Sequence, residues 1–109
     1  MEKIVETLKS VKTNLPATRT FSNVGKLHSG FLEYQHIVAS LPENYQQLKN
    51  KYEKNFTALK LKIDAIADNS NSQKAARYCF KDALYHIQTE IDSIILSISE
   101  ENNPAREGA

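Results

Sequence analysis

Two stretches of the chain repeat the same spacing of apolar side chains, and this repeat restricts the possible folds more than any other feature. In both stretches, seven residues follow one another at steps of 4, 3, 4, 4, 3 and 4. The first series is Leu41, Tyr45, Leu48, Tyr52, Phe56, Leu59 and Ile63, and the second is Ala76, Phe80, Ala83, Ile87, Ile91, Ile94 and Ile98. Eleven residues in three turns give about 3.67 residues per turn, close to an undistorted α-helix. The spacing predicts two long helices that pack along their whole length with almost no supercoil.

These two helices are expected to form an antiparallel hairpin. The first is predicted from Leu41 to about Asp68, and the second from Gln73 to the polar tail that follows Ile98. Each has about 27 residues and a length of about 40 Å. The residues at 69–72 are Asn, Ser, Asn and Ser, which favour a turn.

Each predicted helix is preceded by a possible capping box. Ser40 is followed three residues later by Glu43, and Ser70 is followed three residues later by Gln73. In such a box, the serine hydroxyl accepts a bond from a backbone amide of the first turn while the Glu or Gln side chain reaches back to the serine amide. Both boxes support the predicted helix starts.

Two shorter segments precede the hairpin. Residues 2–15 carry one apolar stripe and end before Pro16, which disfavours a helical residue before it. Residues 21–40 are patterned more loosely, and Gly25 and Gly30 each weaken a helix by about 1 kcal/mol relative to Ala. We expect one helix with a weak first half, although a helix that begins near Ser29 also fits. The predicted inward residues of the two segments are Ile4, Val5, Leu8, Val11 and Leu15, and then Phe21, Val24, Leu27, Phe31, Tyr34 and Val38.

These segments together predict an all-α antiparallel bundle of three to four helices, built on the long hairpin. A chain of 109 residues is sufficient for one such domain, which we assign to residues 1–100. Residues 101–109 are polar, include Pro104 and Gly108 and show no periodicity, so we expect a disordered tail there.

The composition excludes several classes of protein. Fourteen Lys and Arg against thirteen Asp and Glu give a net charge of +1, whereas a nucleic-acid-binding protein that depends on bulk charge is far more basic. The apolar runs are too short to cross a bilayer, and the first residues alternate charged and apolar types, unlike a signal peptide. The single cysteine cannot form an internal disulfide. We therefore expect a cytoplasmic protein with no membrane contact.

The residues that most often carry chemistry are few. The histidines are His28, His36 and His86, and the only thiol is that of Cys79. His28 and His36 lie roughly 80° apart on a helix and cannot hold one metal ion together as an i, i+4 pair could. Cys79 lies at the flank of its stripe, where an inert cysteine is expected. The inward polar residues expected from the pattern are Tyr45, Tyr52, His28 and Gln35, with no inward acid, so we expect no enzyme, no cofactor, no metal and no small-molecule substrate.

Five lysines and one glutamate lie between Lys49 and Lys62. On a helix, most of these lysines border the apolar stripe on both sides, and only Lys54 points fully outward. Their aliphatic stems can cover the edges of the core while the ammonium groups stay in water. A phosphate-binding stripe would gather its lysines on one outward face, so we interpret this cluster as the solvated edge of the core.

One face of the last helix does not fit a plain solvated surface. Tyr78 and Tyr85 are seven residues apart and point about 160 to 180° away from the apolar stripe. Cationic and amide side chains accompany them on the same side, namely Lys74, Arg77, Lys81 and Gln88. Tyrosine and arginine are enriched at protein–protein contacts. Two explanations without a binding function remain open for these tyrosines: they are isolated exposed side chains, or the first segment packs over them.

Two functions follow from this face. The first is a small non-enzymatic interaction protein, such as an adaptor, inhibitor, immunity protein or chaperone, which binds a protein partner or a second copy of itself through Lys74, Arg77, Tyr78, Lys81, Tyr85 and Gln88. The alternative is an accessory protein that binds nucleic acid through the same cations, with the tyrosines stacking on bases. The sequence identifies neither the partner nor the biological process.

Overall fold

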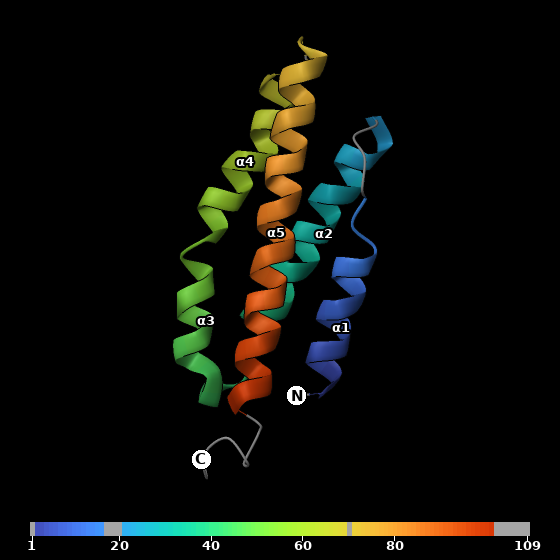
Figure 1. Cartoon of the computed structure of the whole chain (residues 1–109). Helices are drawn as coiled ribbons and strands as arrows, with labels where there is room; N and C mark the ends of the chain where they lie inside the picture. The colour runs from blue at the N-terminus through green and yellow to red at the C-terminus, as the bar shows by residue number, and fades with distance from the viewer. Residues whose placement is uncertain (1, 17–20, 70, 102–109) are drawn as a thin grey trace.

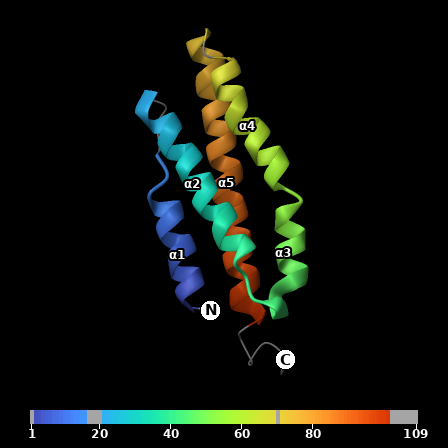
Figure 2. The same cartoon turned by 180° about the vertical axis from the view of Figure 1, so that it is seen from behind.

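A computed structural model of the chain describes residues 2–16, 21–69 and 71–101, and the elements within these ranges are all helical (Figure 1). They are α1 (Glu2–Thr13), α2 (Phe21–Ala39), a 3-10 turn η1 (Glu43–Tyr45), α3 (Gln46–Glu53), α4 (Phe56–Asp68) and α5 (Gln73–Glu101). α1 runs up the bundle, α2 down, α3 and α4 up, and α5 down (Figures 1 and 2). The predicted all-α antiparallel bundle is confirmed.

α5 is the central helix of the bundle. It contacts α1, α2, α3 and α4, and its most extensive contact is with α4. Figure 1 shows α5 in front, with α1 on one side of it, α3 and α4 on the other, and α2 behind. The inward half of α5 is therefore covered by the other helices, whereas its outward half faces solvent.

Most of the apolar residues predicted to lie inward belong to the core. Leu8, Leu27, Phe80 and Ile91 are among those with no exposed surface. Ile4, Val5, Val24 and Phe56 are only partly buried, and the side chain of Phe21 lies outside the described residues. Helical spacing of apolar side chains thus identified the covered face of each segment.

The prediction of one continuous helix from Leu41 to Asp68 is wrong. The segment divides into η1, α3 and α4, with a break at Lys54 and Asn55. The backbone amide of Asn55 donates to the carbonyl of Tyr52 at 3.0 Å, a tighter turn than that of an α-helix. The side-chain amide of Asn55 donates to Glu90 of α5 at 2.8 Å. Asparagine is a poor helix former, and this bond draws it toward α5.

The break positions an aromatic cluster. Phe56 opens α4, and its ring packs edge-on against those of Phe31 and Tyr34 of α2, with centroid separations of 6.3 and 5.9 Å. Edge-to-face packing at these separations is a favourable arrangement of aromatic rings. The first turn of α4 is therefore fixed against the middle of α2.

The predicted capping box at Ser40 and Glu43 is also wrong. α2 continues to Ala39, so Ser40 ends that helix, and its hydroxyl donates to the carbonyl of His36 at 2.8 Å. The N-cap residue of η1 is Pro42, which has extended backbone angles and no side-chain cap. The second predicted box includes Ser70, which lies outside the described residues. The start of α5 is capped by Ser72, whose hydroxyl accepts a bond from the amide of Ala75 at 3.3 Å.

Residues 21–39 form one helix despite its two glycines, as predicted. Gly30 has a packing role, because a Cβ atom there would lie 2.5 Å from Cδ2 of Leu15. The missing side chain lets the end of the first segment lie directly on α2. A Cβ atom at Gly25 would meet nothing within 4 Å.

Candidate interaction face

Tyr78 and Tyr85 project from the outward half of α5, as their spacing predicts. They are 72% and 69% exposed, so neither ring is covered by another helix. Both belong to a helix of 29 residues whose inward side is anchored in the core. The helix therefore fixes the spacing and the direction of the two backbone positions that carry the rings.

The cations beside these tyrosines are exposed as well. Lys74, Arg77 and Lys81 form no ion pair or hydrogen bond with any described residue. Together with Tyr78 they line a shallow hollow of about 480 Å³. Gln88, the sixth residue predicted for this face, is half-buried and lies at its edge.

The first helix does not cover this face. α1 ends at Thr13, and its last turn is fastened to α5 by an ion pair between Lys12 and Asp92, with Nζ and Oδ1 2.7 Å apart. Asp92 lies two turns beyond Tyr85 toward the end of α5. α1 therefore flanks the second half of α5 and leaves both tyrosines exposed. This excludes the explanation that the first segment covers them.

The outward line of α5 contains a third large side chain that was not predicted from the sequence. Leu96 is 60% exposed. It follows Tyr78 by eighteen residues, which is five full turns, so the two side chains point in the same direction. That spacing could have predicted the outward direction of Leu96, but Leu96 follows Ile94 and Ile95 in the sequence and was therefore not distinguished from core residues.

Replacement of both tyrosines by alanine is expected to leave the stability of the single chain nearly unchanged. Exposed side chains away from caps and buried networks contribute within about 0.5 kcal/mol each. The measurement is the Tm of Tyr78→Ala/Tyr85→Ala against that of the unchanged protein, both in dilute solution. A fall of many degrees would mean that the rings are buried and not exposed.

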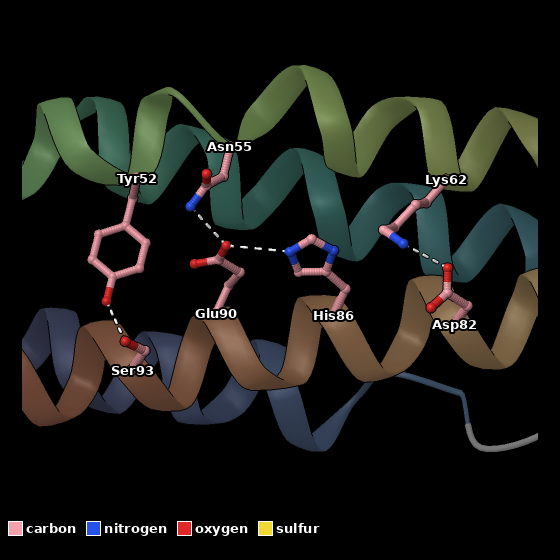
Figure 3. A network of polar contacts seen from close by, with 7 residues as sticks. All are labelled: Tyr52, Asn55, Lys62, Asp82, His86, Glu90 and Ser93. Atoms are coloured by element: carbon pink, nitrogen blue, oxygen red, sulfur yellow. Dashed lines mark hydrogen bonds and ion pairs between the residues drawn. The ribbon is translucent and has the colours of Figure 1, made fainter.

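A polar seam joins α5 to α3 and α4 on the side away from α1 (Figure 3). The hydroxyls of Tyr52 and Ser93 share a hydrogen bond, and Lys62 pairs with Asp82 at 2.6 Å. Between these contacts, Glu90 accepts the bond from Asn55, and its Oε1 lies 3.4 Å from Nε2 of His86. These contacts fix the sideways position of α5 against its neighbours.

Glu90 corrects the expectation that no acid points inward, because this residue is only 9% exposed. A buried carboxylate requires hydrogen-bond donors. Asn55 supplies one from the break between α3 and α4, and His86 lies one turn away on α5 itself. The pattern around Glu90 could not reveal its burial, since the donor comes from a residue 35 positions earlier.

Tyr34 adds an unusual group to the same region. Its ring is fully buried, and its hydroxyl has no hydrogen-bond partner among the described residues. Burial, reinforced by the charge of Glu90 and by Tyr52, raises the pKa of this hydroxyl far above its ordinary value. The hydroxyl therefore stays protonated in the folded protein.

The other groups considered from the sequence lie apart from one another. Cys79 is half-buried and accepts a long contact from the Asn69 amide at 3.6 Å. Of the lysine cluster, Lys62 and Lys60 pair with acids, and Lys51 lies over the Tyr52 ring. Across the described ranges, no group of three His, Cys, Asp or Glu residues is placed to hold a metal ion.

No family model matches the chain, and searches of curated proteins and of solved structures return no match. Within the described residues, none of the helices combines the length and the apolar character needed to cross a membrane. The case for a function therefore depends on the outer face of α5.

Proposed function

We propose that the protein is a small non-enzymatic interaction protein that binds another protein chain through the outer face of α5. The observation that carries this proposal is the exposure of Tyr78 and Tyr85 on one line of a rigid helix. Tyrosine side chains have few rotatable bonds and combine a large apolar ring with a hydroxyl. They therefore supply contact area in an interface at a small cost in conformational entropy.

The cations on the face support the same proposal. Lys74, Arg77 and Lys81 have no acidic partner among the described residues, so they are available to an acidic group on a bound protein. Charged groups around an aromatic centre increase the rate of association and set the orientation of a partner. A helix face of this kind suits an adaptor, inhibitor, immunity protein or chaperone. We include a cytoplasmic location in the proposal, since the single cysteine leaves no internal disulfide.

Nucleic-acid binding is the second candidate, and the hollow lined by Lys74, Arg77, Tyr78 and Lys81 favours it. Three cations around an aromatic ring could hold phosphates while a base stacks on the ring. Neutralising three phosphates of a single strand would give a slope of about −2 in log K against log salt concentration. Fluorescence anisotropy of a labelled single-stranded oligonucleotide at several salt concentrations measures this slope.

The proposed function is tested by a photo-cross-linking amino acid placed at position 85. In cells that make the protein, we expect adducts that contain a second polypeptide chain, identified by mass spectrometry. The matched control carries the same amino acid at position 61, since Leu61 on α4 is also exposed, at 64%. Adducts of equal yield at both positions would contradict the proposal, and adducts with nucleic acid at position 85 would favour the second candidate.

A further inference from the structure

The charges of α5 are segregated along the helix. Residues 73–81 contain three cations and no acid, whereas residues 82–101 contain five acids and neither Lys nor Arg. This order is the reverse of what a helix favours by itself, because the helix dipole stabilises acids near the N-terminus and cations near the C-terminus. The arrangement is, however, complementary to a second α5 that runs in the opposite direction.

The outward residues of α5 are also placed so that they can pair with those of an antiparallel copy. Tyr78, Tyr85 and Leu96 lie on one line of the helix within about 20°. Lys81 and Asp92 both lie about 40 to 60° to one side of that line. A two-fold axis perpendicular to both helices brings the same flank of each helix together. Because the two helices then run in opposite directions, Lys81 of one copy lies beside Asp92 of the other.

We propose that the chain bound at this face is a second copy of the protein. The two α5 helices are antiparallel and cross at the level of Ile87 along the helix, halfway between Tyr78 and Leu96. This inference rests on the proposed function and names its partner. In this register, Tyr78 lies opposite Leu96 of the second copy, and Lys81 lies opposite Asp92 of the second copy. The two-fold axis repeats each contact, giving two apolar pairs and two ion pairs.

The surroundings of these residues admit the arrangement. Asp92 remains 56% exposed while bound to Lys12, so its carboxylate can accept a second cation. The hollow beside Tyr78 provides space for the Leu96 side chain of the other copy. A parallel pair of helices would instead place Lys74, Arg77 and Lys81 against the same cations.

The test uses two charge reversals, Lys81→Asp and Asp92→Lys, with mass measured by sedimentation over a hundredfold concentration range. We expect the unchanged protein to form dimers, and each variant alone to dimerise at least tenfold more weakly. A mixture of the two variants should regain dimers, because the heterodimer contains two ion pairs: one unchanged, between Asp92 and Lys81, and one with its charges exchanged between positions 81 and 92. Lys54→Asp is the matched control, since Lys54 is exposed on the α3–α4 connection, and it should dimerise like the unchanged protein.

Circular dichroism melting of each variant separates loss of dimer from loss of fold. A protein that stays monomeric at all concentrations would overturn the dimer, and so would a mixture of folded variants that forms no heterodimer. Neither result removes the proposed function, which fails if position 85 yields no protein adduct, or no more than position 61, in the cross-linking experiment. Adducts at position 85 with a different protein, together with a monomeric chain, would preserve the proposed function and reject the second copy.

Discussion

Replacement of Ile91 by alanine is expected to lower the free energy of unfolding by about 2–5 kcal/mol. Ile91 has no exposed surface and lies in the middle of α5, the helix that contacts all the others. The change removes buried methyl and methylene groups and leaves a cavity that the surrounding helices cannot fill completely. Urea denaturation followed by circular dichroism measures the loss.

Leu61→Ala is the matched control for this prediction. Leu61 is of similar size and lies on α4, but it is 64% exposed. Its replacement should change the stability by less than about 0.5 kcal/mol. A loss below about 1 kcal/mol for Ile91→Ala would mean that the centre of α5 is not enclosed as described.

Tyr34→Phe is expected to raise the stability of the protein by about 1 kcal/mol at neutral pH. The Tyr34 hydroxyl is buried without a partner among the described residues, and removing a buried unpaired polar group avoids the cost of its desolvation. The phenylalanine ring keeps the edge-on contact with Phe56. Denaturation of both proteins at pH 7 gives the difference, and a variant less stable than the unchanged protein would contradict this account.

The advantage of Tyr34→Phe should grow in alkaline solution. A tyrosine of the unfolded chain ionises near pH 10, whereas burial and the nearby Glu90 raise the pKa of Tyr34 in the folded protein. Above pH 10 the unfolded state therefore releases a proton that the folded state keeps. Stability that is present below pH 10 is lost as the pH rises, by about 1.4 kcal/mol per unit. The phenylalanine variant lacks this contribution, so the difference at pH 11 should exceed the difference at pH 7.

The apolar spacing predicted the faces of the helices well because burial in a bundle depends on direction around the helix. The same spacing could not reveal the break at Lys54 and Asn55. Both residues keep right-handed helical backbone angles, so the stripe passes from Tyr52 to Phe56 without a change of phase. A pattern of inward residues predicts which side of a helix is covered, but it does not show whether the backbone hydrogen bonds of the helix are continuous.

The candidate face was predicted for a related reason. Tyr78 and Tyr85 point outward because the stripe from Phe80 to Ile87 fixes the opposite direction. The environment of Glu90 depends instead on Asn55, a residue far away in the sequence. Contacts between helices of this kind are set by how the helices pack, which the spacing within one helix does not contain.

The break between α3 and α4 divides one side of the bundle into two units that can open separately. A helix of eight residues such as α3 does not persist in water by itself, so α3 depends on the burial of Leu48 and Tyr52. α4 has its own first hydrogen bond, from the amide of Leu59 to the carbonyl of Asn55 at 3.0 Å. Local unfolding can therefore release α3 while α4 stays paired with α5.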